Sequence, residues 1–412
     1  KKYAVLTREP RCFLGSFDFS WEQRKLGDIG ETYTGLSGKT KADFGHGQAR
    51  FVTYMNVFSN PISNPEMTEP IEIDPKQNEV EVGDVFFTTS SETPEEVGMS
   101  SVLLEKRGKT YLNSFCFGFR PSEIIDSYYL AYMLRSESAR DKIILLAQGI
   151  SRYNISKNKV MEIAVSLPSL DEQKLIGQYF RQLDNLITLH QRKFEKLTNV
   201  KKSMLEKMFP QNGSSYPEIR FKGFTDPWEQ RKVGDLLIER NQQAPMSDEY
   251  PLMAFIANEG VAPKGERYDR SALVTDTVNK LYKKTEKGDF IYSSNNLETG
   301  SIGLNKYGKA CISPVYSIFE PTGIADSDFL GRRLVRKDFI NAMVKWRQGV
   351  IYGQWRIHES DFLKIEITVP SVEEQRKIGA YLDQLDNLIT LHQRELEKLQ
   401  NIKKSMLEKM FV

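Results

Sequence analysis

The sequence predicts an α+β protein with a pseudo-two-fold internal duplication, in which two β-rich globular segments are each followed by one long helix. Three observations lead to this prediction. The 412 residues exceed what a single compact core usually holds, two sequence blocks recur roughly 200 residues apart, and each half closes with a long run of regularly spaced apolar residues. We therefore expect two similar but non-identical surfaces in one chain.

Two repeated blocks define the duplication. The first begins at Trp21 and reads WEQRKLGD, and it returns at Trp228 as WEQRKVGD. The second begins at Pro168 and returns at Pro370, with 31 of 42 positions identical. The segments between the blocks agree sparsely, for example at Gly83 and Asp84 with Gly288 and Asp289, and at Gln148 and Gly149 with Gln348 and Gly349. The two halves therefore share the repeated blocks, and the segments between these blocks differ in sequence.

The repeated blocks divide the chain into six segments. Runs of β-forming residues, punctuated by Gly, Asn and Pro, predict strands within Asp84–Thr89, Tyr111–Phe119, Phe290–Ser293 and Val315–Phe319. One shorter helical stretch follows in each half, at Ser127–Leu146 and Ser327–Trp346. The expected segments are a lead-in (1–20), a first β-rich domain (21–167), a central long helix (168–209), a linker (210–227), a second β-rich domain (228–369) and a C-terminal long helix (370–412).

The long helices are predicted from their starts and their apolar spacing. Ser169 and Ser371 each precede acidic residues and a glutamine, which is a helix-capping pattern. Apolar residues then recur at alternating spacings of four and three, which is typical of a heptad seam between paired helices. His190 and Lys201, with the matching His392 and Lys403, interrupt the seam, and polar seam residues usually fix register or partner choice. The central seam positions are Leu183, Ile187, His190 and Phe194 in the first helix and Leu385, Ile389, His392 and Leu396 in the second.

An alternative interpretation is that each apolar stripe packs only against its own domain. The heptads continue for some 38 residues, and a helix of that length spans about 57 Å, so helix pairing is favoured. Antiparallel pairing would bring His190 and His392 close to the crossing point. A metal site there would need further ligands, and we therefore predict no metal site.

Composition narrows the functional classes. The net charge of +2 is too small for a general basic field, because domains that bind phosphates in that way usually have a pI above about 9. The odd, widely spaced Cys12, Cys116 and Cys311 indicate neither disulfides nor a zinc site. No apolar run approaches the ~20 residues of a membrane helix, and no signal peptide follows Lys1 and Lys2. We expect a cytoplasmic protein with no membrane partner.

Catalytic motifs are missing from the sequence. The run Gly303–Lys309 has phosphate-loop spacing, but Ala310 replaces the Ser or Thr that would hold magnesium. We find no Asn-Pro-Pro-aromatic motif of an amino-methyltransferase, no dinucleotide fingerprint and no nucleophile elbow. We therefore predict no catalytic residue in this chain.

The repeated blocks resemble those of the specificity subunits of type I restriction-modification systems. The resemblance rests on the duplicated WEQRK blocks and on the two Pro-Ser helices that end in KSMLEKMF, and it covers essentially the whole chain. One departure is the lead-in, where Arg11–Ser16 match Pro217–Gly223 poorly although the family normally has the same lead-in twice.

The resemblance implies a non-catalytic DNA-binding subunit. Each β-rich domain would be a target recognition domain that reads one half of a bipartite double-stranded DNA target. The two helices would pair as an antiparallel coiled coil that acts as a ruler and docks two modification (methyltransferase) subunits. Restriction and translocation subunits would join a larger complex, and S-adenosylmethionine, ATP and Mg²⁺ are expected in these partners, with no cofactor in this chain.

The resemblance also indicates which residues contact DNA. In this family the loop that follows Gln-Gly and leads into the last strand lies near DNA. Arginine can bridge two acceptors on guanine, and Asn or Gln can do the same on adenine. The loop positions in this sequence are Arg152, Tyr153 and Asn154 in the first half, and Tyr352, Gln354 and Arg356 in the second.

Two further groups of residues are candidates for DNA contacts. The first could contact phosphates, or could form an ordinary solvated basic face: Lys39, Lys41 and Arg50, and Lys264, Lys280, Lys283 and Lys284. The second forms polar turns that reach base edges or merely close hairpins: Thr88–Ser91, which includes Ser90 and Ser91, and Ser293, Ser294, Asn295 and Asn296.

Two other functional classes remain open at this point. A structural adaptor would tether partner proteins through its helices and would show no sequence-dependent, salt-sensitive DNA binding. A standalone methyltransferase or nuclease would act without any partner, and the missing motifs argue against it.

Overall fold

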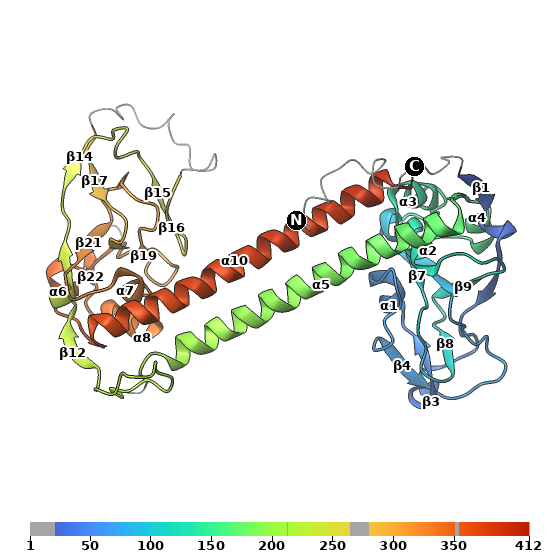
Figure 1. Cartoon of the computed structure of the whole chain (residues 1–412), viewed down its shortest axis with the longest axis horizontal. Helices are drawn as coiled ribbons and strands as arrows, with labels where there is room; N and C mark the ends of the chain where they lie inside the picture. Colours follow the sequence, from blue (N-terminus) through green and yellow to red (C-terminus); the bar gives the residue numbers. More distant parts are fainter. Residues whose placement is uncertain (1–20, 212, 264–279, 351–353, 412) are drawn as a thin grey trace. The chain divides into compact units, whose positions relative to one another are not determined.

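The computed structural model describes residues 21–211, 213–263, 280–350 and 354–411 (Figure 1). The chain divides into two compact units. Unit 1 comprises the residues up to Arg192 together with those from Gln393 onward, and unit 2 comprises Lys193–His392. Each unit holds one β-rich domain and one end of each of the two long helices, α5 (Leu170–Lys207) and α10 (Val372–Lys409).

The domain of unit 1 is built on two sheets. The larger is antiparallel and ordered β2-β9-β5-β7, with β2 (Gly30–Thr34), β9 (Cys116–Pro121), β5 (Val85–Thr88) and β7 (Ser100–Val102). The smaller is ordered β4-β3-β8, with β4 (Thr68–Ile71), β3 (Phe44–Val52) and β8 (Thr110–Leu112), and β3 pairs with β8 in parallel. Two short ladders pair β1 (Glu22–Lys25) with β11 (Ala164–Leu167), and β6 (Ser90–Ser91) with β10 (Tyr153–Asn154). The short helices are α1 (Tyr54–Ser59), α2 (Ser127–Met133), α3 (Glu137–Ile144) and α4 (Lys157–Met161).

The domain of unit 2 repeats the plan of the larger sheet, whereas its smaller sheet is antiparallel throughout. Its larger sheet is ordered β13-β21-β18-β19, with β13 (Leu237–Glu239), β21 (Ser317–Pro321), β18 (Phe290–Tyr292) and β19 (Ile302–Leu304). Its smaller sheet is ordered β14-β17-β20, with β14 (Gln243–Ala244), β17 (Tyr282–Thr285) and β20 (Ala310–Ile312). The remaining pairs are β12 (Glu229–Lys232) with β24 (Glu366–Val369), β15 (Ala254–Ile256) with β16 (Gly260–Ala262), and β22 (Gln348–Val350) with β23 (Gln354–Arg356). The short helices are α6 (Val233–Leu236), α7 (Ser327–Arg333), α8 (Lys337–Val344) and α9 (Glu359–Phe362). The predicted internal duplication and α+β class are confirmed.

The repeated opening block has a structural reason. In each unit the first strand pairs antiparallel with the last strand of the same domain, so Glu22 lies opposite Leu167 and Glu229 opposite Val369. The last strand then leads directly into the long helix. This ladder closes the domain and fixes the point from which the helix leaves it.

The predicted starts of the long helices are also confirmed. The Ser169 hydroxyl accepts a hydrogen bond from the Glu172 N–H at 3.4 Å, and Ser371 does the same for Glu374. Gln173, which we expected to complete the cap, instead donates to the Pro168 carbonyl at 2.9 Å and accepts from the Asp126 N–H at 3.0 Å. Because Asp126 caps α2, this buried glutamine ties the start of α5 to the domain.

Three predicted elements are each divided in the structure, and one of them is the helix expected over 327–346, which is α7 and α8. The single helix expected over 127–146 is two helices, because the buried Ser136 side chain accepts from the Ala139 N–H and starts a new helix, α3. The expected strand 111–119 is also two strands in different sheets. Asn113 turns the chain between them by accepting from the Phe115 N–H at 2.9 Å and donating to the Val52 carbonyl at 3.0 Å.

An aromatic side chain from the end of a long helix closes each core. In unit 1, Phe411 packs on Phe180 of α5 and Tyr129 of α2, with ring centroids 5.6 and 5.5 Å apart. In unit 2, Phe209, which occupies the equivalent repeat position, packs on Phe329 of α7 at 5.5 Å. All five rings are almost fully buried, and each such side chain contributes about 1.5 to 3 kcal/mol to folding. Neither domain core is complete without the helix end that packs on it.

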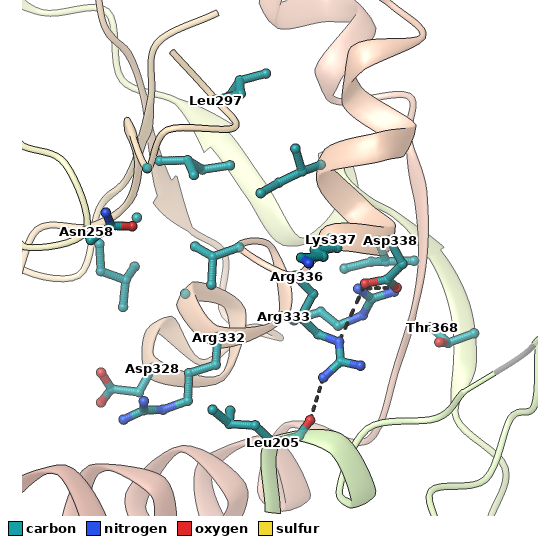
Figure 2. Close-up of a pocket in the computed structure, with 18 of the residues that line it drawn as sticks. Leu205, Asn258, Leu297, Asp328, Arg332, Arg333, Arg336, Lys337, Asp338 and Thr368 are labelled. Atoms are coloured by element: carbon teal, nitrogen blue, oxygen red, sulfur yellow. Dashed lines mark hydrogen bonds and ion pairs between the residues drawn. The ribbon is translucent and has the colours of Figure 1, made fainter. Parts of the chain in front are cut away.

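A groove of about 1350 Å³ lies in unit 2 where the end of α5 meets the domain (Figure 2). Arg333 of α7 pairs with Asp338 at 3.0 Å, and Arg336 donates to the backbone oxygen of Leu205 in α5. These cationic groups are compensated by their neighbours within the unit. We therefore interpret the groove as the junction between helix and domain and assign it no ligand.

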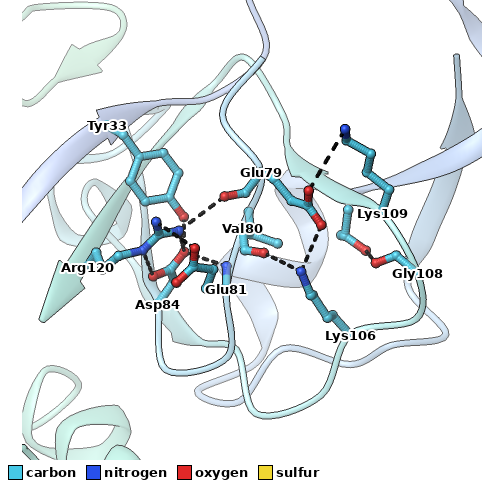
Figure 3. A network of polar contacts seen from close by, with 10 residues as sticks. Tyr33, Glu79, Val80, Glu81, Asp84, Lys106, Gly108, Lys109 and Arg120 are labelled. Carbon is cyan, nitrogen blue, oxygen red and sulfur yellow. Dashed lines mark hydrogen bonds and ion pairs between the residues drawn. The ribbon is translucent and has the colours of Figure 1, made fainter. Parts of the chain in front are cut away.

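A buried carboxylate joins three neighbouring strand segments in unit 1 (Figure 3). Asp84, which directly precedes β5, is 1% exposed and accepts from Nε and Nη2 of Arg120 in β9, both at 2.8 Å. It also accepts from the Tyr33 hydroxyl of β2 at 2.5 Å and from the Glu81 N–H at 2.8 Å. Burial and the adjacent charge of Asp84 raise the pKa of Tyr33, so the phenol remains a donor.

Unit 2 keeps the carboxylate and changes its partners. Asp289, the counterpart of Asp84, lies 2.9 Å from Nε of Arg240, a residue that follows β13. Glu320 of β21 occupies the position of Arg120 and pairs with Arg240 at 2.6 Å. The shared Gly-Asp sequence is thus explained by a structural carboxylate whose arginine comes from a different neighbouring segment in each unit.

Replacing this carboxylate should destabilise unit 1. Asp84→Ala removes the buried partner that Arg120 and Tyr33 share, and because the guanidinium is partly exposed we expect a loss of about 2 to 3 kcal/mol in the free energy of unfolding. Urea unfolding followed by circular dichroism measures this loss. Glu81→Ala, which removes the exposed partner of Arg120, should cost less than about 0.5 kcal/mol. Equal losses in the two variants would contradict this account of the network.

Candidate nucleic-acid interface and helix seam

The polar seam residues pair between the two long helices within each unit. In unit 1, Lys403 of α10 lies 2.6 Å from Asp184 of α5, and Tyr132 of α2 donates to the same carboxylate at 2.7 Å. The Lys403 ammonium also lies over the Tyr132 ring at 5.4 Å. Asp184 therefore holds the opposite helix and its own domain at the same time.

The equivalent residues pair in unit 2. Lys201 of α5 lies 2.5 Å from Asp386 of α10, and Arg332 of α7 binds the second carboxylate oxygen at 2.9 Å. Burial alone would raise the pKa of Asp386, but the hydrogen bonds from Lys201 and Arg332 outweigh it and hold that pKa below its ordinary value. Lys201 and Lys403, the lysines that interrupt the apolar seam, thus have specific partners on the other helix.

The predicted seam positions differ in burial, and their pairing along the whole length of the helices stays a prediction. Leu183 and Leu385 are buried, and the other predicted seam positions are half-buried. Those are Ile187, His190, Phe194, Ile389, His392 and Leu396. Sets of three or more His, Cys, Asp or Glu suited to hold a metal ion do not occur in the described ranges, and no helix there is long and apolar enough to cross a bilayer.

Hydrogen bonds join three loops at one place in unit 1. The carbonyl of Phe115, in the turn between β8 and β9, accepts from both the N–H and the hydroxyl of Thr89 at 2.9 Å. The Thr89 carbonyl accepts in turn from the Ile155 N–H at 2.9 Å. Next to Thr89, the β6–β10 ladder places Ser90 opposite Asn154 and Ser91 opposite Tyr153. The predicted polar turn and the predicted DNA-contacting loop therefore lie side by side.

The loop that carries Arg152 is closed at its base. Gln148 and Asn154 exchange two backbone hydrogen bonds of 3.0 and 2.8 Å. Gly149 has a φ of 146°, and a Cβ at this position would lie 2.0 Å from the Arg152 carbonyl oxygen. Only glycine fits there, which explains the Gln-Gly sequence in this unit. The loop presents the exposed Arg152 side chain while its Nη2 donates to the Ser90 hydroxyl at 3.1 Å.

The corresponding loops also meet in unit 2. The hairpin β22–β23 places Gln348 opposite Arg356. Asn295 accepts from the Trp355 N–H at 2.7 Å, and the Ser294 hydroxyl accepts from the Ile357 N–H at 3.0 Å. Arg356 is exposed, with Glu359 at 3.9 Å. The same two loops therefore meet in both units and carry different side chains.

The polar turns differ in burial between the two units. Ser90 and Ser91 are nearly buried, and the Ser91 hydroxyl donates to Glu96 at 3.1 Å. The Ser90 hydroxyl also accepts the hydrogen bond from Arg152. In unit 2, by contrast, Asn295 and Asn296 are exposed. Tyr352 and Lys264 lie outside the described residues, and only the backbone of Gln354 is described.

Several of the predicted phosphate contacts are engaged within the protein. Lys39 pairs with Asp74 at 2.8 Å, which raises the pKa of the lysine and holds that of Asp74 well below its usual range. Arg50 donates to the Thr68 hydroxyl at 2.6 Å. Lys283 is buried, and Lys284 lies over the Tyr250 ring. Lys41 and Lys280 are exposed. DNA contacts by these residues stay predictions, and Lys39 and Arg50 would have to exchange existing bonds to make them.

Several exposed apolar residues in these loops were not predicted from sequence patterns. Ile150 at the tip of the Arg152 loop is 96% exposed, and Phe115 is 55% exposed. In unit 2, Trp355 of β23 is 49% exposed, and Val315, in the turn that matches that of Phe115, is 68% exposed. A side chain at a variable loop tip has no periodic pattern, so sequence spacing could not identify these residues.

Known proteins with similar sequence or structure agree with these observations. A family model for the type I restriction modification DNA specificity domain matches residues 20–199 and 225–401. The type I restriction enzyme MjaX specificity subunit of Methanocaldococcus jannaschii is 24% identical over 408 residues, which is 96% of this chain and 93% of the relative. The MjaVIII specificity subunit of the same organism is 26% identical over 310 residues, or 69% of each chain. The crystal structure of a type I restriction-modification S subunit from M. genitalium has a TM-score of 0.56 and 15% sequence identity, with 97% of each chain covered.

Charge reversal tests the ion pair of unit 1. Asp184→Lys places two cations together and should lower the free energy of unfolding by about 2 to 3 kcal/mol. Adding Lys403→Asp should restore about 1 to 2 kcal/mol, because the pair reforms with opposite orientation. The same exchange at the exposed pair Asp171 and Lys174 should change the free energy by less than about 0.5 kcal/mol. If Lys403→Asp restores nothing, the pair does not hold the helices together.

Acid should weaken unit 2 through Asp386. Because the folded-state pKa of this carboxyl is lowered, its stabilisation is present at neutral pH and is lost as pH falls below the ordinary aspartate pKa of about 4. The difference in free energy of unfolding between the wild type and Asp386→Asn should therefore shrink between pH 6 and pH 3, as measured by urea titrations. Asp171→Asn serves as the exposed control. A difference that does not depend on pH would refute this linkage.

Proposed function

The chain belongs to the type I restriction-modification DNA specificity family, and from this premise we propose that it reads a bipartite DNA target, one half-site per domain. The main support is that each unit brings the same two loops together around different side chains. Arg152 and Asn154 lie against Ser90 and Ser91 in unit 1. Trp355 and its neighbour Arg356 lie against the Ser294–Asn295 turn in unit 2. Two loop pairs with the same arrangement but different side chains suit two half-sites of different sequence.

The chemistry of the exposed loop side chains suits base recognition. Arg152 and Arg356 each present a planar guanidinium that can bridge O6 and N7 of guanine. Asn154 presents an amide that suits adenine. Each well-formed pair of this kind discriminates between bases by about 1 to 3 kcal/mol. In this proposal the arginines carry most of the specificity.

The paired helices would form an antiparallel coiled coil that sets the distance between half-sites. Asp184 and Lys201 are separated on α5 by the same number of residues as Asp386 and Lys403 on α10, so both ion pairs fit one antiparallel register. Each helix has 38 residues, which corresponds to about 57 Å. One turn of B-DNA measures about 34 to 36 Å, so a rigid pair of this length can space two reading surfaces along the duplex.

The duplicated helix sequence would also dock two modification subunits. The stretch LDNLITLHQR occurs unchanged at 183–192 and 385–394. Leu189 and Leu391 within it are 46% and 51% exposed, so each copy of the stretch leaves a leucine side chain open to solvent. Two identical surfaces suit two copies of one partner. Methyl transfer with S-adenosylmethionine, and restriction with ATP and Mg²⁺, would belong to the partner subunits in a cytoplasmic complex, and this chain would supply no catalytic residue.

DNA binding by the assembled complex tests the proposal. The chain with its cognate modification subunit should bind DNA that carries the target more tightly than scrambled DNA, typically by 10³-fold or more, and affinity should fall steeply as salt increases. Fluorescence anisotropy measures both effects. Equal binding to both DNAs, or none, by an assembled complex would favour a protein-tethering adaptor.

Single arginine substitutions should act on one half-site each. Arg152→Ala should relax specificity only in the half-site read by unit 1, and Arg356→Ala only in the other, each by about 1 to 3 kcal/mol. Affinity for a panel of single-base target variants measures the effect. Arg107→Ala, an exposed arginine paired with Glu66, provides a matched control with unchanged specificity. Equal weakening on every DNA would indicate phosphate contacts instead.

A further inference from the structure

The loop cluster of unit 1 exposes two large apolar side chains beside Arg152. Ile150 is 96% exposed, the largest exposed fraction among the apolar side chains of the described residues, and Phe115 is 55% exposed. A single exposed apolar residue is common and needs no explanation. Here two of them lie on loops that are both hydrogen-bonded to the Thr89–Ser90 segment, and one of these loops carries the candidate base-reading arginine. This combination needs an explanation.

The hydrogen bonds fix these side chains relative to the arginine. Ile150 and Arg152 lie in the loop that Gln148 and Asn154 close with two backbone hydrogen bonds. Arg152 binds Ser90, and the adjacent Thr89 holds the turn of Phe115 through two hydrogen bonds to its carbonyl oxygen. The apolar tips and the guanidinium therefore belong to one constrained surface.

Unit 2 also exposes apolar side chains in the two corresponding loops. Trp355 lies in the second strand of the hairpin that corresponds to the Arg152 loop, and Val315 lies in the turn between β20 and β21. Both are about half exposed or more. Val315 occupies the repeat position of Phe115, whereas Trp355 occupies that of Tyr153, so the two units expose apolar side chains in the same two loops but not at the same positions in both.

We propose that Ile150 recognises thymine through its C5-methyl group, within two base pairs of the base pair that Arg152 contacts. The proposal rests on the DNA-reading function proposed above and adds the base that the apolar tips select. The thymine methyl is the apolar feature that the bases present in the major groove, and aliphatic side chains contact it. Ile150 has no donor or acceptor on its side chain, so methyl recognition is the discrimination available to it.

The length of chain between Ile150 and Arg152 limits the distance between their Cα atoms. Two residues of chain span at most about 7 Å, and successive base pairs are about 3.4 Å apart. The Cα atoms of Ile150 and Arg152 are therefore at most about two base-pair steps apart, and this separation defines the positions to test. A cytosine in place of that thymine would lack the methyl and would leave the apolar tip against a polar edge.

Deoxyuracil substitution tests this contact directly. In the half-site that Arg152→Ala relaxes, each thymine is replaced in turn by deoxyuracil, which lacks only the methyl group, and the dissociation constant of the complete complex with its modification subunit is measured. For the wild type, one or two replacements within two base pairs of the Arg152-dependent position should weaken binding about threefold to tenfold, as expected for one buried methyl.

Substitutions at Ile150 test whether its side chain causes the difference in affinity between the thymine and deoxyuracil targets. Ile150→Ala should bind the thymine and deoxyuracil targets with nearly equal affinity, while Ile150→Val should keep most of the difference. Ile124→Ala provides the control, because Ile124 is 85% exposed in the same unit but precedes α2, and it should retain the full difference.

Two results would overturn the inference. If Ile150→Ala keeps the wild-type ratio of thymine to deoxyuracil affinity, Ile150 does not read the methyl. If Ile150→Ala instead prevents assembly with the modification subunit, the apolar tip contacts protein. Both results differ from failure of the proposed function itself, in which the wild-type complex would show no sequence preference at all.

Discussion

The lysine–aspartate pairs between the long helices are the interactions on which the rest of the structure depends. In each unit an aspartate in the first half of one helix binds a lysine near the end of the other. The same aspartate binds a side chain of the adjacent domain, Tyr132 in unit 1 and Arg332 in unit 2. Slightly beyond each lysine, a phenylalanine enters the domain core. Because these cores include side chains from both helices, the helix register and the integrity of each domain are coupled.

The duplication separates the parts of the chain that must stay the same from those that can differ. The closing ladders, the helix starts and the buried Gly-Asp carboxylates recur in both units. Even there the partners change, since Asp84 binds Arg120 whereas Asp289 binds Arg240. The loops above the frame differ more freely, from a buried Ser90 and an exposed Ile150 to an exposed Asn295 and Trp355. A constant frame of this kind lets the reading surface change without a cost to folding.

The sequence was sufficient for features that depend on neighbouring residues or on the repeat. The helix starts at Ser169 and Ser371 follow from local capping, and the two-domain plan follows from the repeat. The sequence was insufficient where contacts with residues distant in the chain determine the local structure. Ser136 divides a helix because its buried hydroxyl starts a new one, Lys39 is engaged by Asp74, and Gln173 binds the cap of another helix instead of its own. The candidate loops were found through the family resemblance, whereas the exposure of Ile150 depends on a loop closure that no sequence pattern marks.

The central claim is that one chain reads two half-sites at a fixed separation. Methylation mapping across a genome tests it most directly, in cells that express this chain with its cognate modification subunit. The account predicts modified bases within a single bipartite motif whose two parts are separated by a constant number of unspecified base pairs. An assembled, active complex that modifies one continuous motif, or bases in no defined motif, would contradict it.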